Sequence, residues 1–195
     1  MGIFLTAVFF LLITPGPGVL STAGVGAAFG SRAGYRYVLG LCIGTNLVAI
    51  AVVTGLAGIV LAQPALRTFL LYASVLYLCY LAFRIAFAGS RIAFIESNKA
   101  PGIADALALQ AINPKAYVVN TTLFTGFEFA GMPLWQETAW KFLLINLIWI
   151  PIHIAWLAAG IGLQKLNLPT KWQRAINVLM AVSLLMVVTL AVTMS

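Results

Sequence analysis

Long apolar stretches without charge follow one another along the chain. Residues 1–31, 37–66, 68–83, 142–164 and 175–195 contain no Asp, Glu, Lys or Arg, and residues 105–127 contain only Asp105 and Lys115. A transmembrane helix needs about 20 mostly apolar residues. The pattern therefore predicts six transmembrane helices with short connections, the longest at about residues 89–104.

The basic residues fall mainly in alternate connections. Two of them, Arg67 and Lys141, lie after the second and fourth predicted helices. Eight lie after the first, third and fifth: Arg32, Arg36, Arg84, Arg91, Lys99, Lys165, Lys171 and Arg174. Lys and Arg are retained on the cytoplasmic side of a membrane, so we expect both termini outside the cytoplasm.

The two halves of the chain share features at a nearly constant offset. Pro15 and Pro114 are 99 residues apart, and Asn46 and Asn146 are 100 apart. Three helices per half make the halves cross the membrane in opposite senses, the plan of many secondary transporters. We therefore predict an all-α membrane protein with one domain over residues 1–195: a repeat at about 1–88, a cytoplasmic loop at about 89–104 and an inverted repeat at about 105–195.

Helices one and four of this scheme contain proline motifs near their middles. Pro15, Gly16 and Pro17 interrupt the first, and Asn113 and Pro114 interrupt the fourth. A proline inside a helix removes a hydrogen bond, and in lipid the freed carbonyls need protein or a wet cavity. A second half-helix beginning near Pro17 would turn its free N–H groups and positive dipole end toward a bound carboxylate. A purely structural kink is the alternative interpretation.

Lys115 directly follows the second break, about 15 Å into the fourth helix at 1.5 Å per residue. A lysine at that depth costs about 2.5–3.5 kcal/mol and must face protein or a cavity. It could bind a substrate carboxylate, carry a proton, or cap the carbonyls exposed at the break. Asn113 is a natural cap for the half-helix that starts at Pro114.

Other intramembrane polar residues are weaker candidates. Asn46, Asn120 and Asn146 could line a cavity or join helices by hydrogen bonds. His153 could carry protons near neutral pH or simply pack. Asp105, near the cytoplasmic end of helix four, could bind an amino group or a proton, or cap the helix.

Composition agrees with a membrane protein. Of the 195 residues, 63% are hydrophobic and 8% are charged, and the mean hydropathy is +1.05. So few charges exclude a soluble enzyme, a disordered chain and a free nucleic-acid binder, and the net charge of +7 fits the cytoplasmic loops better than a nucleic-acid partner. Cys42 and Cys79 form no motif for zinc or a disulfide framework.

Four segments resemble the LysE/RhtB family of bacterial amino-acid exporters, over nearly the whole chain. They are residues 14–17, residues 30–34, residues 77–81 and residues 110–116. The resemblance implies efflux of amino acids or close derivatives across the bacterial inner membrane, driven by the proton gradient, with no organic cofactor.

The chain departs from that family's pattern at two positions. Gly18 stands where Asp or Asn is frequent, and Ala106 where glycine is usual. Residues 108–110, 156–160 and 173–177 are similar to the branch that exports cysteine and O-acetylserine. That similarity and the scarcity of intramembrane acids favour a small neutral substrate, such as cysteine, O-acetylserine, threonine or homoserine, over a basic one.

The resulting hypothesis is a proton-coupled exporter with its site between helices one and four. The predicted substrate-binding residues are Pro15, Gly16, Pro17, Gly18, Asn46, Asn113, Pro114, Lys115 and Asn146, and the proton-coupling candidates are Lys115, His153 and Asp105. The alternatives are a metal-ion exporter, which would want clustered ligands, a thiol–disulfide relay through Cys42 and Cys79, and a non-catalytic membrane subunit. The oligomeric state, a homodimer included, stays open.

Overall fold

The described part of the chain is helical. The computed structural model describes residues 1–14, 16–56, 58, 62–86, 100–165, 169, 171–172, 174–176, 178–179, 181–182 and 185–186, and no strand occurs among them. The helices are α1 (Gly2–Ile13), α2 (Pro17–Val53), α4 (Pro64–Ala86), α5 (Ile103–Ile112), α6 (Pro114–Thr125) and α7 (Leu134–Lys165). The predicted all-α class is confirmed for these residues.

Both predicted helix breaks are present. α1 ends at Ile13 and α2 begins at Pro17, with Gly16 as its N-cap residue. α5 ends at Ile112 and α6 begins at Pro114. In each case the new helix starts on a proline, which has no N–H to lose and a φ angle suited to the first helical position. Pro15 lies outside the described residues.

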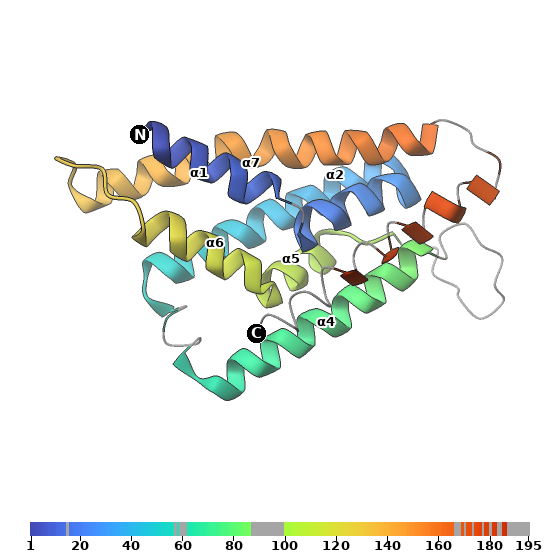
Figure 1. Ribbon diagram of the computed structural model, residues 1–195, viewed down its shortest axis with the longest axis horizontal. Helices are drawn as coiled ribbons and strands as arrows, with labels where there is room; N and C mark the ends of the chain where they lie inside the picture. Colours follow the sequence, from blue (N-terminus) through green and yellow to red (C-terminus); the bar gives the residue numbers. More distant parts are fainter. Residues whose placement is uncertain are drawn as a thin grey trace.

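The connection between the first two predicted helices is tighter than expected. The hydrophobic pattern places it around Arg32 and Arg36, but both arginines have helical backbone, and the turn occurs at Gly30, with φ 77° and ψ −169°. Figure 1 shows the chain doubling back within α2, and Gly26 and Gly34 on either side of the bend both face Leu157. Glycine reaches this positive φ without steric cost, so one residue reverses the chain.

Other boundaries differ from the predicted ones by several residues. The second predicted helix runs to residue 66, whereas α2 ends at Val53 and a turn follows at Gly55, φ 78°. α4 begins at Pro64 instead of residue 68, and α7 begins at Leu134 instead of residue 142. Residues 89–99 of the predicted loop and much of the predicted sixth helix lie outside the described residues.

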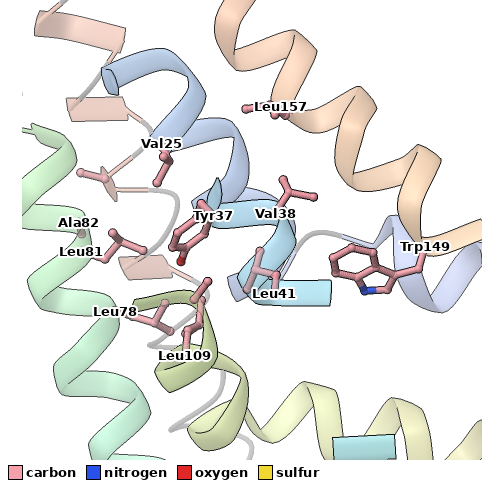
Figure 2. Close-up of a cluster of buried hydrophobic side chains, with 12 residues drawn as sticks. Val25, Tyr37, Val38, Leu41, Leu78, Leu81, Ala82, Leu109, Trp149 and Leu157 are labelled. Atoms are coloured by element: carbon pink, nitrogen blue, oxygen red, sulfur yellow. The ribbon is translucent and has the colours of Figure 1, made fainter. Parts of the chain in front are cut away.

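α2 packs closely on α5 and α7 through its glycines. A β-carbon on Gly40 would lie 2.5 Å from the Ile103 carbonyl oxygen, and one on Gly44 would lie 2.7 Å from Cβ of Gln110. The main core forms where these helices meet α4, with Tyr37 and Leu41 from α2, Leu109 from α5 and Trp149 from α7 (Figure 2). Small residues allow backbones to approach in this way inside a membrane.

A second apolar cluster joins α1, α6 and α7 near the N-terminus. It contains Phe4 and Val8 of α1, Leu123 of α6, Ile145 of α7 and Phe129 of the connection after α6. The ring of Phe4 meets that of Phe129 edge-on with centroids 5.1 Å apart. Figure 1 shows the N-terminus and the α6–α7 connection at one end of the molecule, with the α2 bend and the end of α7 at the other.

The outer surface suits a lipid environment. By length and composition, two described segments could cross a membrane: Leu134–Leu163, and Pro17–Val53, which doubles back at Gly30. Large apolar side chains point outward on several helices, among them Ile3 at 81%, Leu76 at 70% and Leu147 at 60% exposure. Such exposure over many helices would be costly in water.

Candidate functional site

A cavity of about 50 Å³ lies where the two helix breaks meet, with room for a few water molecules. Residues from both breaks line it, together with residues of α2 and α7. Its polar or aromatic lining, glycines included, consists of Thr14, Gly16, Gly18, Thr45, Gln110, Asn113, Lys115, Asn120, Trp149 and His153. Five predicted site residues are therefore brought together: Gly16, Gly18, Asn113, Lys115 and His153.

Lys115 bridges the two breaks. Its Nζ donates a hydrogen bond of 2.6 Å to the carbonyl oxygen of Thr14, at the open C-terminal end of α1. A β-carbon on Gly16 would lie 2.8 Å from Cδ and 3.1 Å from Nζ of Lys115, so the glycine leaves space for this side chain. The ammonium group has three donors. Capping α1 uses one of them, and among the described residues the other two have no acceptor, so they are available to a ligand in the cavity.

The two helix N-termini at the breaks differ in their capping. Asn113 caps α6, because its Oδ1 accepts a hydrogen bond of 3.1 Å from the Lys115 backbone N–H, as predicted. Its Nδ2 donates to Oε1 of Gln110 at 2.9 Å, which fixes the amide orientation. At α2 the cap residue is Gly16, which makes no side-chain cap, and the first intrahelical bond comes from Leu20 N–H to Gly16 oxygen.

The N-terminus of α2 is consequently the more open of the two helix N-termini. The N–H groups of Gly18 and Val19 precede the bond of Leu20, and both residues line the cavity. The positive end of the helix dipole adds to them. These amides and the Lys115 ammonium together present positive charge and donors to one small space.

His153 reaches the cavity from α7. Its side chain is buried, with 4% exposure, and its Nδ1 lies 3.0 Å from the carbonyl oxygen of Trp149. The imidazole stacks on the Trp149 ring, with centroids 3.5 Å apart and an interplanar angle of 13°. Nε2 points at α2, where a β-carbon on Gly18 would lie 3.4 Å away.

Asn46 and Asn146 bind each other and do not line the cavity. Nδ2 of Asn46 donates to Oδ1 of Asn146 at 2.9 Å, and the reciprocal bond measures 2.8 Å. Each amide also donates to the carbonyl four residues earlier in its own helix, Cys42 or Phe142. The pair joins α2 to α7, and its part in substrate binding stays a prediction.

Asp105, Pro17 and Pro114 are not among the residues that line the cavity. Oδ2 of Asp105 accepts a hydrogen bond of 2.8 Å from the Gly102 backbone N–H, which caps α5. The Asp105 carbonyl oxygen accepts another from the Tyr77 hydroxyl at 2.7 Å. Pro17 and Pro114 occupy the first positions of α2 and α6 and shape the breaks. A proton-coupling role for Asp105 stays a prediction.

Sequence reasoning missed several lining residues. Gln110 is 3% exposed and connects α5 to α2 through a hydrogen bond of 3.4 Å from its Nε2 to the Leu41 carbonyl oxygen. Thr45 and Trp149 also line the cavity. Gln110 and Thr45 are polar residues in apolar stretches, which was a usable signal. Trp149 looks like any core aromatic in the sequence.

The described residues offer little support for the alternative functions, metal-ion export and a thiol–disulfide relay. No group of three or more His, Cys, Asp or Glu side chains there is placed to hold a metal ion. Cys42 and Cys79 are both free, and Cys42 points its Sγ toward Oδ1 of Asn146 at 3.8 Å. One buried ion pair, Glu137 with Lys141 at 2.5 Å, lies on the first turns of α7, away from the cavity lining.

Comparison with known proteins identifies the family. The chain is 26% identical over 129 residues to the leucine efflux protein of Klebsiella pneumoniae subsp. pneumoniae, which is 64% of this chain and 61% of that protein. It is 27% identical over 131 residues to the leucine efflux protein of an Enterobacter species, with the same coverage of 64% and 61%. The match thus spans about three fifths of these relatives' length. No solved structure matches the chain.

The family profile covers almost the whole sequence, in agreement with the helical fold and the apolar surface. It extends over residues 9–195 and is that of the LysE type translocator, a family of transporters and not of enzymes. This chain belongs to the LysE type translocator family.

Proposed function

We propose that this protein is a secondary transporter that exports amino acids or close derivatives from the bacterial cytoplasm. The observation that carries the proposal is the cavity between the two helix breaks, into which Lys115 and the open N-terminus of α2 both point. A carboxylate placed there would receive hydrogen bonds from the free Lys115 donors and from the Gly18 and Val19 amides.

The lining favours a neutral side chain on the substrate. No carboxylate occurs among the residues that line the cavity in the described part of the chain. A second positive charge on the substrate would therefore lack a partner beside Lys115. The relatives named leucine efflux proteins agree with a neutral amino acid. The preference for a small side chain rests on the sequence resemblance and on the small volume of the cavity.

We further propose six spans in two inverted repeats, with both termini outside the cytoplasm. Three observations support this plan. The two breaks meet through Lys115 and Thr14, and Asn46 pairs with Asn146 at a separation of 100 residues. The α2 bend, next to Arg32, lies at the same end of the molecule as the end of α7, with Lys165 (Figure 1). Basic residues gathered at one end are typical of the cytoplasmic side.

Alternating access would follow from rocking of the two halves about the cavity. At the end of the molecule that holds the N-terminus, Phe4 of α1 packs against Phe127 and Phe129, which follow α6 in the sequence. Separation of α1 from α6 would open the cavity toward the outside. Proton coupling would use Lys115 or His153 in the cavity, or Asp105 at the start of α5.

The test is amino-acid release from cells that overexpress the protein and are fed dipeptides. We expect faster release of one or a few neutral amino acids than from cells with an empty vector. Lys115→Ala and Pro17→Ala should lose this gain while inserting in the membrane at wild-type amounts. Leu147→Ala, on the exposed face of α7, is the matched control and should export normally. Normal efflux by both site variants would refute the site.

A further inference from the structure

The neutral form of His153 presents a hydrogen-bond acceptor to the cavity. A backbone carbonyl only accepts hydrogen bonds, so the His153 nitrogen next to the Trp149 oxygen, Nδ1 at 3.0 Å, is the one that carries hydrogen. In a neutral imidazole the other nitrogen then has a free lone pair. That nitrogen, Nε2, has no hydrogen-bond partner among the residues that the structure describes, although the side chain is only 4% exposed.

The ring is held in this orientation. Its stacking on Trp149, at 3.5 Å and 13°, fixes the plane, and the Nδ1 contact fixes the rotation within that plane. Trp149 is itself 2% exposed and belongs to the main core. Nε2 is not among the buried atoms that lack a partner, and His153 lines the cavity, so a ligand or water in the cavity can complete its hydrogen bond.

The acceptor lies across the first turn of α2 from the Lys115 ammonium. Nζ of Lys115 would be 3.1 Å from a β-carbon on Gly16, and Nε2 of His153 would be 3.4 Å from one on Gly18. Two residues of chain span at most about 7 Å. Both groups line the same cavity, so the carboxylate and ammonium of one α-amino acid, with one hydrogen bond of about 2.9 Å at each end, can contact them together.

We infer that His153 is a substrate-binding residue whose Nε2 accepts a hydrogen bond from the ammonium group of the transported amino acid. This inference rests on the proposed function and deepens it. The carboxylate end lies on Lys115 and the α2 amides, and the amino end lies on His153. Oδ1 of Asn120 is a second acceptor in the same lining, because Nδ2 of that residue donates to the Ala116 oxygen at 2.8 Å.

The arrangement selects molecules that carry both groups. A carboxylic acid without an amino group would displace water from Nε2 without replacing its hydrogen bond, so it should bind more weakly than the amino acid of the same shape. An amine without a carboxylate would bring its positive charge next to the Lys115 ammonium with no negative charge between them, so it should also bind weakly. The expected ligand class is therefore the α-amino-acid zwitterion with an uncharged side chain.

Two substitutions separate the acceptor from the rest of the ring. His153→Asn keeps an amide near the Nδ1 position, where it can still donate to the Trp149 oxygen, and removes Nε2. His153→Gln places an amide oxygen near the Nε2 position and so restores the acceptor. Leu147→Ala, at an exposed position on the same helix, is the control for effects on membrane insertion and purification.

The assay is counterflow of radiolabelled L-leucine or L-threonine into proteoliposomes that contain the purified full-length protein. Unlabelled leucine and 4-methylpentanoate, which is leucine without its amino group, compete in parallel. In the wild type, leucine should compete at least about tenfold better than the deaminated acid. His153→Asn should lose about tenfold in leucine affinity with little change for 4-methylpentanoate, and His153→Gln should recover most of the difference.

The outcomes separate this inference from the proposed function. If His153→Asn keeps the wild-type preference for leucine over 4-methylpentanoate, Nε2 does not have the proposed role. The same conclusion follows if His153→Asn and His153→Gln both lose affinity for leucine and for 4-methylpentanoate to the same extent. Absence of counterflow by the wild-type protein with every neutral amino acid tried would refute the proposed function itself. Loss of leucine preference in His153→Asn, with recovery in His153→Gln, establishes the inference.

Discussion

Gly16→Ala tests whether transport depends on the position of Lys115. The added β-carbon would lie 2.8 Å from Cδ and 3.1 Å from Nζ of Lys115, closer than ordinary contact, so the flexible side chain must move. That movement breaks the bond of 2.6 Å from Nζ to the Thr14 oxygen. The substitution should not strain the backbone, because φ of Gly16 is −167°, an extended value that alanine also adopts.

The expected effect is larger on transport than on folding. A hydrogen bond from a charged donor contributes about 1.5–3 kcal/mol, and about 1.4 kcal/mol corresponds to a factor of ten. The fraction of molecules with Lys115 in its observed place should fall by about ten- to a hundredfold. The free energy of unfolding should fall by about 0.5–2.5 kcal/mol, because the alanine restricts the unfolded chain and so offsets part of the lost hydrogen bond.

The assay is the initial rate of amino-acid release, normalised to the amount of protein in the membrane, alongside the melting temperature in detergent. We expect Gly16→Ala to lose most export while its melting temperature falls by only a few degrees. Combination with Lys115→Ala should cause no further loss, because both changes act through one side chain. Wild-type export by Gly16→Ala, or additive losses in the double variant, would refute this reasoning.

Three further predictions concern the helices around the cavity. Asn46→Leu should lower the free energy of unfolding in detergent by about 0.6–2 kcal/mol, because the amide of Asn146 loses its partner. Adding Asn146→Leu should recover much of that loss, and a second equal loss would contradict the pairing. Lys141→Met should lower the melting temperature by removing the buried ammonium that binds the carbonyl oxygens at the end of α6, while the remaining folded protein transports normally; an unchanged melting temperature would contradict this role. Cys42→Ser with Cys79→Ser should export at the wild-type rate, whereas loss of export would favour a thiol mechanism.

The sequence was most informative where backbone chemistry decides the structure. Pro17 and Pro114 cannot continue a helix without losing a hydrogen bond, and both helices begin on them. The cap by Asn113 on the half-helix that starts at Pro114 follows from the same local rules. These effects act over a few residues, so a single sequence reveals them.

The remaining features depend on how the helices pack. The reversal at Gly30 needs its positive φ, and many glycines in apolar stretches are instead contact points like Gly40. Asn46 and Asn146 satisfy each other because α2 and α7 lie together at that height, which no spacing within one helix encodes. Gln110 faces the cavity rather than lipid through the rotation of α5, set by its packing on α2.

Transport by the purified protein tests the central proposal most directly. Proteoliposomes loaded with a neutral amino acid, with and without an imposed pH gradient, would be followed for its release, using wild-type protein and Lys115→Ala. The proposed mechanism predicts release by the wild type that is faster with the gradient and lost in Lys115→Ala. Equal release from proteoliposomes and protein-free vesicles, for every neutral amino acid tried, would contradict it.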